Sequence, residues 1–361
     1  MNICIVAGAR PNFIKIAPIV WAIEKQQPQV RDLDYTLVYT GREDDPTLEA
    51  SLFDDLQLQR PTVYLGASCE NLNELTGQVM QAFEQYLKNH PTDVVIVVDD
   101  LASTMAAAIV AKKQGLFLAH LVAGTRSFDI SMPKEINRLV IDGLSDLLFT
   151  AGLGSNSIVT REGAENDKVY MVGNILMDTL RRNRERFVRP AVLEEKGIAD
   201  GQYLVLTLNR KALLQNKKKL ERLLNHLIGA ANGMPIVAPL RDSARQTIEE
   251  INLQPSSLIL HPSLSYLEFG YLTQHACGII TDSGNVAEEA TFNGVPCITL
   301  NNYTEHMETV SQGTNVLVGE DPDRLSTATE NLVRGEWKRS TLPDRWDGRA
   351  AERIVYTLLH R

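Results

Sequence analysis

The chain has 361 residues, of which 44% are hydrophobic and 22% charged, and its formal net charge is −9. The hydrophobic content excludes the charge-rich, apolar-poor class of disordered proteins, and the length predicts two domains. The acidic balance argues against sequence-independent nucleic-acid binding, which needs a basic surface, so we expect no nucleic-acid partner.

The hydropathy pattern predicts no membrane partner, because no apolar run approaches the roughly 18–20 residues that cross a bilayer. The first residues, MNICIVAGARPNF, lack the basic head and cleavage site of a signal peptide. The cysteines, Cys4, Cys69, Cys277 and Cys297, are scattered without a C-x-x-C pair. Such spacing disfavours disulfides and zinc sites and is typical of small buried hydrophobes. We therefore expect a cytoplasmic protein with no metal and no cofactor.

Short β-branched runs alternate with longer amphipathic stretches in the first half of the chain. The pattern predicts strands at 2–8, 36–40, 94–98 and 116–124, and helices at 11–25, 45–57, 71–89 and 102–114. Continuous apolar runs separated by helices indicate a parallel sheet that is covered on both faces. We expect residues 120–138 to include a long polar loop that follows the last of these strands.

A second alternation of strands and helices starts near residue 200. Strands are predicted at 203–209, 235–240, 258–263, 277–284 and 296–301, and helices at 217–232 and 286–293. The fold class is therefore α/β, with two Rossmann-like, doubly wound domains that face a cleft. We place these domains at residues 1–171 and 172–348, with a final helix at 349–361 that packs back on the first. Ligands of such sheets bind beyond the carboxyl ends of the strands.

The turn after the first strand is one candidate site. It reads Gly8-Ala9-Arg10-Pro11 and is followed by Lys15 one turn into the helix. A small-residue turn at a helix N-terminus presents backbone N–H groups, and the two basic side chains add positive charge there. These features predict an anion site, with a plain tight turn and solvated bases as the alternative.

A second candidate is the turn Asp282-Ser283-Gly284-Asn285, which opens a helix with Glu288 and Glu289. The Ser283 hydroxyl and the following amides are able to hold a phosphate, and a carboxylate one turn later can accept bonds from a ribose diol. A simple helix cap is the alternative. Two phosphate-binding turns in separate domains favour a nucleotide diphosphate over a lone phosphate as the ligand.

Acidic and basic residues gather in two further stretches. Asp99-Asp100 follows a buried strand and precedes Ser103-Thr104, and paired carboxylates at a strand end suit acid–base or metal chemistry. Adjacent strand residues point to opposite faces, however, so helix capping is the alternative. The stretch 120–138 concentrates His120, Arg126, Asp129, Lys134, Glu135, Asn137 and Arg138. Such polar density after a buried strand indicates a site, with a solvated loop as the alternative.

Taken together, the motifs resemble those of the non-hydrolysing UDP-N-acetylglucosamine 2-epimerases. They read G-x-R-P-x-x-I-K (8–15), S-F-D-x-x-M-P-x-E-x-N-R (127–138), V-G-N-x-x-x-D (172–178), T-D-S-G-x-x-x-E-E (281–289), G-V-P (294–296), G-T-N-x-x-V-G (313–319) and D-R-W-D-G-R-A-A-E-R-I-V (344–355). The resemblance covers essentially the whole chain in the expected order. It implies the two-domain fold of GT-B glycosyltransferases, a homodimer and a UDP-sugar ligand.

The resemblance also implies roles for single residues. It puts Arg10 and Lys15 near the diphosphate, Ser283 and Gly284 in the diphosphate-binding turn, Glu289 at the ribose hydroxyls and Asp100 at an acidic catalytic position.

Other family positions are substituted. Val122 stands where H-V-E-A-G has Glu, Lys134 where P-E-E-x-N-R has its first Glu, and Asn209 where T-x-H-R has His. Further changes are Arg42-Glu43 for Gln-His, His306-Met307 in the E-R-P motif, and Leu240-Arg241 in the strand end P-V-H.

These substitutions bear on the reaction that the resemblance implies, in which the C2 proton of the sugar leaves together with UDP and returns on the opposite face. Such chemistry needs at least two acid–base groups, each worth roughly 10²–10⁴-fold. Val122 and Asn209 transfer no proton, and Lys134 as an ammonium stabilises charge instead. Glu135 or Asp129 is the substitute carboxylate that the sequence offers.

We therefore predict a UDP-2-acetamido-sugar protein whose C2 epimerisation, the interconversion of UDP-GlcNAc and UDP-ManNAc, is impaired. Three alternatives stay open at this point. They are a working isomerase, a non-catalytic UDP-sugar binder or partner subunit of an active epimerase, and a GT-B-type transferase or hydrolase of a UDP-sugar.

Overall fold

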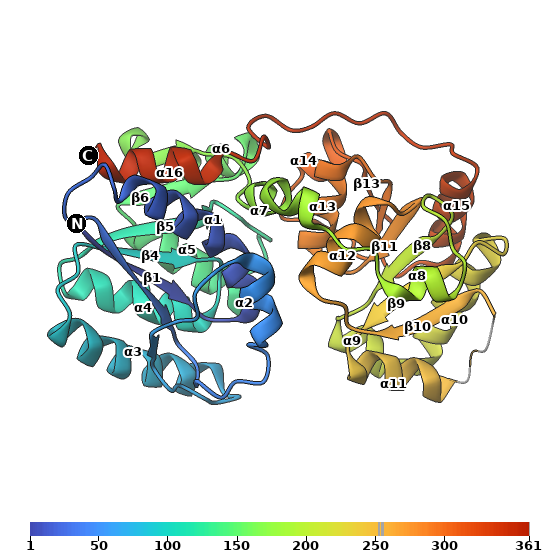
Figure 1. Cartoon of the computed structure of the whole chain (residues 1–361), viewed down its shortest axis with the longest axis horizontal. Helices are drawn as coiled ribbons and strands as arrows, with labels where there is room; N and C mark the ends of the chain where they lie inside the picture. The colour runs from blue at the N-terminus through green and yellow to red at the C-terminus, as the bar shows by residue number, and fades with distance from the viewer. Residues whose placement is uncertain (252, 254–255, 361) are drawn as a thin grey trace. The chain divides into compact units, whose positions relative to one another are not determined.

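The computed structural model describes residues 1–251, 253 and 256–360, and the chain forms two compact units (Figure 1). Unit 1 consists of Met1–Arg182 together with the C-terminal segment that begins at Asp344, and unit 2 consists of Asn183–Pro343. Each unit contains one parallel sheet with helices packed on its faces. Both sheets are doubly wound, which confirms the predicted α/β fold class.

The sheet of unit 1 has the strand order β3-β2-β1-β4-β5-β6-β7. Its strands are β1 (Asn2–Ala7), β2 (Asp34–Tyr39), β3 (Val63–Tyr64), β4 (Val94–Val98), β5 (Phe117–Ala123), β6 (Leu147–Thr150) and β7 (Val169–Met171). The helices are α1 (Arg10–Gln26), α2 (Ala50–Leu56), α3 (Leu72–Asn89), α4 (Ala102–Lys113), α5 (Pro133–Leu144), α6 (Leu153–Arg161), α7 (Leu176–Asn183) and α16 (Ala350–Leu359). The central strand β4 reads VVIVV and is buried throughout, as a strand covered on both faces requires.

The C-terminal segment is fastened to unit 1 through two of the motifs. Trp346 is fully buried, and its indole Nε1 donates to the carbonyl oxygen of Ala151 over 3.1 Å. The carboxylate of Asp178 accepts from the backbone N–H groups of Ala350 and Ala351 at 3.0 and 2.8 Å, which caps the first turn of α16. Helix α16 then packs against α1. These motif residues therefore serve the fold of unit 1.

The sheet of unit 2 has the strand order β10-β9-β8-β11-β12-β13. Its strands are β8 (Leu204–Thr207), β9 (Ile236–Leu240), β10 (Leu258–Pro262), β11 (Gly278–Thr281), β12 (Cys297–Thr299) and β13 (Asn315–Leu317). Its helices are α8 (Ala191–Glu195), α9 (Lys211–Gln215), α10 (Lys217–Ala230), α11 (Asp242–Ile251), α12 (Tyr266–Gln274), α13 (Gly284–Asn293), α14 (Glu308–Ser311) and α15 (Pro322–Val333).

Alternate residues of β8 divide the core of unit 2 into two clusters. Leu204 and Leu206 pack with apolar residues of α10, α11 and α15. Val205 packs with residues of α8, α12 and α13. Since successive strand residues point to opposite faces, α10 and α15 cover one face of the sheet and α12 and α13 the other.

Several sequence-based expectations differ from the structure. The stretch 120–138 is a loop only between β5 and α5, because Pro133 starts a helix, a position where its missing N–H costs nothing. The helix expected at 45–57 forms only as α2. Cys4 and Cys297 are buried, but Cys69 and Cys277 are partly exposed, so the expectation of four buried cysteines was wrong for these two.

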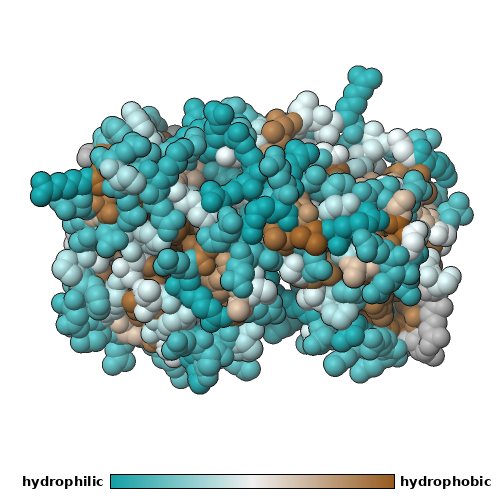
Figure 2. Space-filling view, viewed as in Figure 1, coloured by the Kyte–Doolittle hydropathy of each residue, from teal (hydrophilic) through white to brown (hydrophobic). Residues whose placement is uncertain are grey.

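Some large apolar side chains are exposed, among them those of Phe128, Ile130 and Leu153. Figure 2 shows hydrophilic residues over most of the visible face and hydrophobic ones in small, scattered patches. No helix in the described part of the chain is both long and apolar enough to cross a membrane.

Candidate functional site

The strand order locates the candidate site within each unit. In both sheets the chain first winds outward on one side of the starting strand and then on the other, so the direction reverses between β1 and β4 in unit 1 and between β8 and β11 in unit 2. Ligands of doubly wound sheets bind outside the carboxyl ends of the strands at this topological switch point. The loops that follow these four strands contain the candidate residues Arg10, Asp100, Asn209 and Ser283.

The turn after β1 in unit 1 is closed by a side chain that the motif analysis did not single out. Asn12 Oδ1 accepts from the backbone N–H groups of Gly8 and Ala9 at 2.9 and 3.1 Å, and Asn12 Nδ2 donates to Asp99 Oδ2 over 2.8 Å. Two amides that the predicted anion site would offer are therefore already bonded within the chain. An Asn at the second position of the predicted helix 11–25 was the available signal, since such residues commonly bond the turn that starts the helix.

Lys15 forms a nearly buried ion pair with Asp99. Its Nζ lies 2.5 Å from Asp99 Oδ1, and the Lys15 side chain is only 8% exposed. Asp99 follows β4 with φ 59°, a left-handed conformation, so the alternation expected for adjacent strand residues ends at Val98. Arg10 is the first residue of α1 and is partly exposed. The two predicted diphosphate ligands thus differ, because only Arg10 keeps a solvent-accessible side chain.

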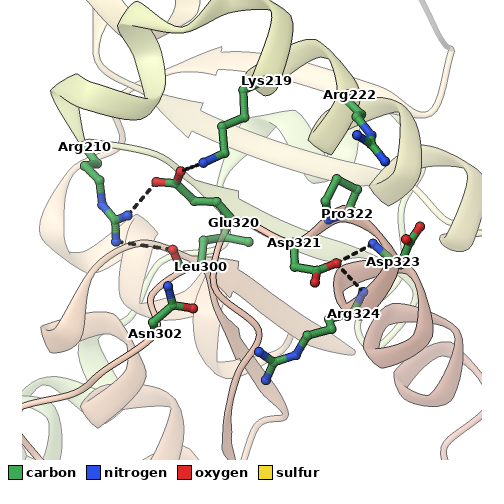
Figure 3. Close-up of a pocket in the computed structure, with 10 residues that line it drawn as sticks. All are labelled: Arg210, Lys219, Arg222, Leu300, Asn302, Glu320, Asp321, Pro322, Asp323 and Arg324. Atoms are coloured by element: carbon green, nitrogen blue, oxygen red, sulfur yellow. Dashed lines mark hydrogen bonds and ion pairs between the residues drawn. The ribbon is translucent and has the colours of Figure 1, made fainter.

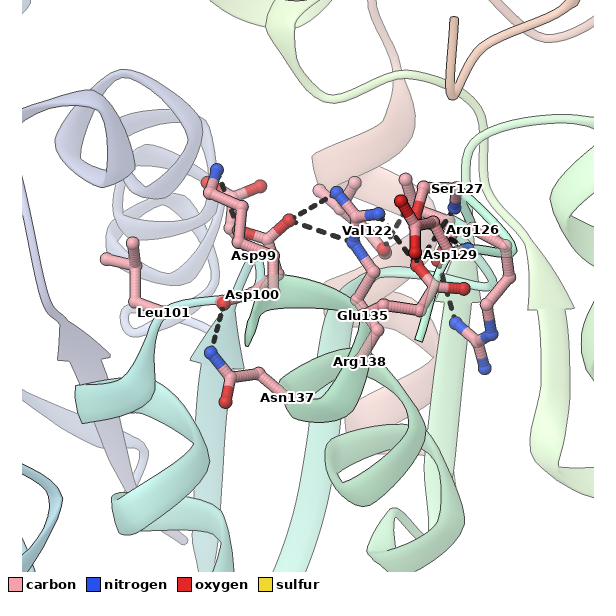
Figure 4. Close-up of polar contacts among 12 residues, drawn as sticks. Asp99, Asp100, Leu101, Val122, Arg126, Ser127, Asp129, Glu135, Asn137 and Arg138 are labelled. Carbon is pink, nitrogen blue, oxygen red and sulfur yellow. Dashed lines mark hydrogen bonds and ion pairs between the residues drawn. The ribbon is translucent and has the colours of Figure 1, made fainter. Parts of the chain in front are cut away.

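Asp100, which the resemblance puts at an acidic catalytic position, is held by two cations, Arg138 and Lys134; Figure 4 shows Arg138 bonded to it. Its Oδ2 accepts from Arg138 Nε and Nη2 at 2.9 and 2.6 Å, and Lys134 Nζ lies 3.3 Å from Oδ1. Burial alone would raise the pKa of Asp100, but Lys134 and Arg138 outweigh it and hold this pKa below its ordinary value. The carboxylate is therefore stabilised as an anion and is a weak base.

Glu135 and Asp129, the possible substitute carboxylates, bind the loop that precedes α5. Glu135 is buried and accepts from Ser127 N, Ser127 Oγ, Phe128 N and Arg138 Nη1 at 2.9 to 3.0 Å. Burial raises its pKa, but the bonds from Ser127 and Phe128 lower it more, and the net shift is downward. The exposed Asp129 accepts from Ser131 N and Oγ. Both carboxylates are thus engaged in fixing this loop.

Val122 adopts a backbone conformation that is rare for its type. Its φ is 71°, and the pairing of β5 with β6 shifts register between Leu121 and Ala123. A β-branched residue in this region stores strain of order 1–3 kcal/mol, which proteins usually keep at functional positions. The position at which the resemblance expects a catalytic Glu therefore has an unusual backbone geometry, and its side chain is an alkyl group.

The other polar residues of 120–138 form a buried network. His120 Nδ1 lies 2.6 Å from Asp142 Oδ1, and Asp142 Oδ2 accepts from the N–H of Gly124 over 3.1 Å. Arg126 pairs with Asp142 at 2.7 Å and with Glu162 at 2.6 Å. Asn137 Nδ2 donates to the carbonyl oxygen of Asp100, which fixes α5 against the turn after β4. His120, Arg126 and Asn137 consequently support the loops of unit 1.

Asp282 joins the two loops at the switch point of unit 2. Its Oδ2 accepts from the backbone N–H groups of Asn209 and Arg210, each over 2.7 Å. Its Oδ1 is buried and, among the described residues, has no hydrogen-bond partner. Asn301, after β12, donates to the carbonyl oxygen of Asp282 over 3.2 Å, and its buried Oδ1 likewise lacks a partner in the described part of the chain. Two buried acceptor atoms, Asp282 Oδ1 and Asn301 Oδ1, therefore have no hydrogen-bond partner here among the described residues.

The predicted diphosphate turn lies directly beside these acceptors. Ser283 is the N-cap residue of α13 and Gly284 is its first helical residue. Glu289, predicted to bind the ribose, is buried in the same helix, and the buried Glu288 lies 3.3 Å from His306 Nε2. Asn209 is exposed after β8. In residues 1–251, 253 and 256–360, no three His, Cys, Asp or Glu side chains gather so that they could hold a metal ion.

Known proteins resemble the chain over nearly its whole length. The family described as UDP-N-acetylglucosamine 2-epimerase matches residues 25–359. The UDP-N-acetylglucosamine 2-epimerase of Methanocaldococcus jannaschii is 32% identical over 100% of this chain and 99% of the relative. The UDP-2,3-diacetamido-2,3-dideoxy-D-glucuronate 2-epimerase of Pseudomonas aeruginosa is 33% identical over 90% of each chain.

Solved structures agree with these relatives. The Methanocaldococcus jannaschii UDP-GlcNAc 2-epimerase in complex with UDP-GlcNAc and UDP has a TM-score of 0.86 at 31% identity and covers 100% of both chains. A lipopolysaccharide outer core galactosyltransferase, with a TM-score of 0.56 at 13% identity over 99% of this chain and 100% of that one, shares the fold alone. The sequence, the two doubly wound sheets and these relatives together show that the chain belongs to the UDP-N-acetylglucosamine 2-epimerase family.

Proposed function

We propose that this chain binds a UDP-2-acetamido sugar and catalyses its C2 epimerisation far more slowly than family members that retain the acid–base residues. One observation carries the catalytic half of the proposal. The carboxylate of Asp100 is held by Arg138 and by Lys134, which itself stands at a substituted family position, and two further family positions hold Val122 and Asn209.

The geometry of unit 2 supports binding of the UDP moiety. The first turn of α13 offers backbone N–H groups and the positive end of the helix dipole to a diphosphate, with the Ser283 hydroxyl beside them. Asp282 Oδ1 and Asn301 Oδ1 are buried acceptors without partners among the described residues. A buried acceptor without a partner costs about 1–3 kcal/mol, which a ligand donor such as a ribose hydroxyl or the uracil N–H recovers.

The relatives support the same ligand class. A relative at 31% identity over the full chain has been solved with UDP-GlcNAc and UDP. Ser283, Gly284 and Glu289 are the matching positions of this chain in unit 2, and Arg10 is a partly exposed cation of unit 1. We therefore assign UDP binding to these residues together with Lys15, whose ammonium group also pairs with Asp99.

The chemistry of unit 1 supports impaired turnover. Removal of a C2 proton beside an acetamido group needs a base, and protonation on the opposite face needs an acid. Asp100 is a weak base because its pKa is lowered, and Glu135 is fully engaged by the 127–128 loop and Arg138. Loss of two groups worth roughly 10²–10⁴-fold each predicts a rate at least about 10⁴-fold below that of the family.

The family resemblance and the cysteine content support two further parts of the proposal. We infer that the protein is cytoplasmic, and that it acts as a homodimer or as a partner of an active epimerase.

The test is a calorimetric titration of UDP-GlcNAc run beside a turnover assay that follows the anomeric protons by NMR, with the Methanocaldococcus jannaschii epimerase as the positive control. Saturable binding with turnover at least about 10⁴-fold below the control supports the proposal. A control-like rate contradicts impaired catalysis. Absence of binding contradicts the assignment of unit 2. Release of free UDP without formation of UDP-ManNAc contradicts C2 epimerisation and indicates a transferase or hydrolase.

A further inference from the structure

We propose that unit 2 carries a second ligand site, a pocket of about 600 Å³ that binds a small phosphate-bearing anion. It lies where the loops after β8, β12 and β13 meet the first turns of α10 and α15 (Figure 3). Its lining residues are Arg210, Lys219, Arg222, Leu300, Asn302, Glu320, Asp321, Pro322, Asp323 and Arg324. The volume is within the range of small-molecule sites.

The pocket borders a basic stretch of an acidic chain, although Glu320, Asp321 and Asp323 also line it. Residues 209–224 contain six basic side chains and one acidic one, although the whole chain has a net charge of −9. Lys217, Lys218 and Lys219 form the start of α10, which has no acidic residue in its first turn. Positive charges are unfavourable at that end of a helix, so this arrangement costs free energy in the unliganded protein. Bound negative charge would offset the cost.

Two of the four basic side chains share one carboxylate. Glu320 accepts from Arg210 Nη1 over 2.6 Å and forms an ion pair with Lys219 Nζ. Burial raises the pKa of Glu320, but Lys219 and then Arg210 lower it more, so this carboxylate stays ionised. The bond to Glu320 fixes the Arg210 guanidinium on one side of the pocket. The guanidinium also donates to the carbonyl oxygen of Leu300.

The other two basic side chains, Arg222 and Arg324, form no ion pair with the described residues. Within the described residues, neither Arg222 nor Arg324 has a carboxylate at ion-pair distance; Arg324 Nη2 donates to the carbonyl oxygen of Leu317 over 2.6 Å. Asp321 is turned to its own helix, where it accepts from Asp323 N and Arg324 N. Figure 3 shows Arg222 without a bond to the other residues drawn. The planar guanidinium suits two parallel bonds to phosphate oxygens, which selects a phosphate-bearing anion.

The pocket is separate from the proposed UDP turn. Helices α10 and α15 cover one face of the sheet, whereas α13, which starts at the Ser283-Gly284 turn, packs on the opposite face. Arg210 lies between them, because its backbone N–H bonds to Asp282 and its guanidinium lines the pocket. Occupancy of the pocket therefore does not require an empty UDP turn, and the inference stands whether or not UDP-GlcNAc is turned over.

The test uses inorganic pyrophosphate as the probe in calorimetric titrations of the full chain. The double variant Arg222→Gln/Arg324→Gln is compared with Lys196→Gln/Arg339→Gln, which removes the same charge from exposed positions of unit 2 outside the pocket. We expect wild type and control to bind alike and the pocket variant to bind about tenfold more weakly, as the loss of a charge-assisted contact predicts. A saturating concentration of UDP should leave pyrophosphate affinity within about twofold.

Three results would overturn the inference. They are absence of pyrophosphate binding to wild type, equal affinity of the pocket and control variants, and complete displacement by UDP, which would assign the anion to the α13 turn. Matched melting temperatures of the two variants show that both are folded. A failure of UDP-GlcNAc to bind in the separate titration would count against the proposed function alone.

Discussion

Unit 1 and unit 2 have the same strand order at the switch point, but their polar groups there are paired to different extents. In each unit a carboxylate follows the fourth strand in chain order. It is Asp99 after β4 in unit 1 and Asp282 after β11 in unit 2. Both oxygens of Asp99 are bonded to side chains of α1. Asp282 uses one oxygen for two backbone N–H groups and leaves the other buried without a partner among the described residues.

This difference indicates which unit is prepared for a ligand. In unit 1, Asp99, Asp100 and Glu135 are each satisfied within the chain, mainly by Lys15 and Arg138. A group that is already satisfied offers a ligand little free energy, since binding only exchanges one bond for another. Unit 2 keeps oriented but unpaired acceptors and therefore gains by binding. This contrast is what the proposed function rests on: nucleotide recognition in unit 2, and in unit 1 carboxylates that are bonded within the chain.

The largest expected effect comes from restoring the family residues. The triple variant Val122→Glu/Lys134→Glu/Asn209→His should raise the rate of UDP-GlcNAc epimerisation by about 100-fold or more, because each acid–base group contributes roughly 10²–10⁴-fold. Anomeric-proton NMR measures the rate. Val122→Gln/Lys134→Gln/Asn209→Gln is the matched control without acid–base groups. Equal rates for the two triple variants would show that these positions no longer limit turnover.

Breaking the ion pair at the switch point of unit 1 should cost the most stability. Lys15→Met leaves the Asp99 carboxylate nearly buried with one partner fewer, and removal of one partner from a buried pair costs about 3 kcal/mol. Urea unfolding measures the loss. Lys25→Met is the control on the same helix, because Lys25 is 72% exposed and its loss should cost under about 0.5 kcal/mol. Similar losses for the two variants would show that the Lys15–Asp99 ion pair adds little to the free energy of unfolding.

Asp178 should make the stability of unit 1 depend on pH. Burial raises its pKa from 3.8 to about 6, although its two backbone bonds oppose the shift. Folding therefore favours the neutral acid, so its contribution is full below about pH 4 and is lost as the pH rises through about 6. The stability of wild type relative to Asp178→Asn should fall by up to about 3 kcal/mol between pH 4 and pH 7. A pH-independent difference in urea midpoints would contradict this assignment.

Removing the joining carboxylate of unit 2 should weaken UDP binding. Asp282→Ala leaves the N–H groups of Asn209 and Arg210 without their acceptor and deletes the acceptor offered to the ligand, which predicts about a 20-fold loss of UDP affinity. Calorimetry measures the affinity. Asp242→Ala changes an exposed acid of the same unit and should leave it unaltered. Unchanged UDP affinity in Asp282→Ala would place the nucleotide elsewhere.

The smallest expected effect concerns the strained position in unit 1. Glycine tolerates φ 71°, so Val122→Gly should stabilise the fold by about 1 kcal/mol, whereas Val122→Ala should not because alanine keeps the strain. Urea midpoints of the two variants measure the difference. A loss of stability in Val122→Gly would show that side-chain packing outweighs the backbone strain at this position.

Much of the fold follows from the sequence because its central strands are uninterrupted β-branched runs. VVIVV at 94–98 matches β4 residue for residue. The sequence does not predict the short strands β3, β6, β7 and β13, since two to four residues carry no period that distinguishes strand from helix. The sequence predicts a loop in place of helix α5 because the buried face of this helix is polar, with Glu135, Asn137 and Arg138 directed inward.

The sequence predicts the turns that form the candidate site but not the contacts of their residues. Asp100, Asn209 and the Ser283-Gly284 turn lie at the switch points, where doubly wound sheets hold ligands. The partners of these residues were not predictable, because Asp99 lies 84 positions from Lys15 and Asp282 lies 72 from Arg210. Sequence motifs locate a loop, but the charge state of a carboxylate depends on neighbours that only the fold brings near.

The fate of the C2 proton tests the central claim most directly. UDP-GlcNAc at a concentration that calorimetry shows to saturate the protein is incubated in D₂O, and the C2–H signal is followed by proton NMR beside the Methanocaldococcus jannaschii epimerase. We predict that the signal persists in the presence of this protein while the control exchanges it. Deuterium incorporation at C2 at the rate of the control would show that a working acid–base pair survives and would contradict the account.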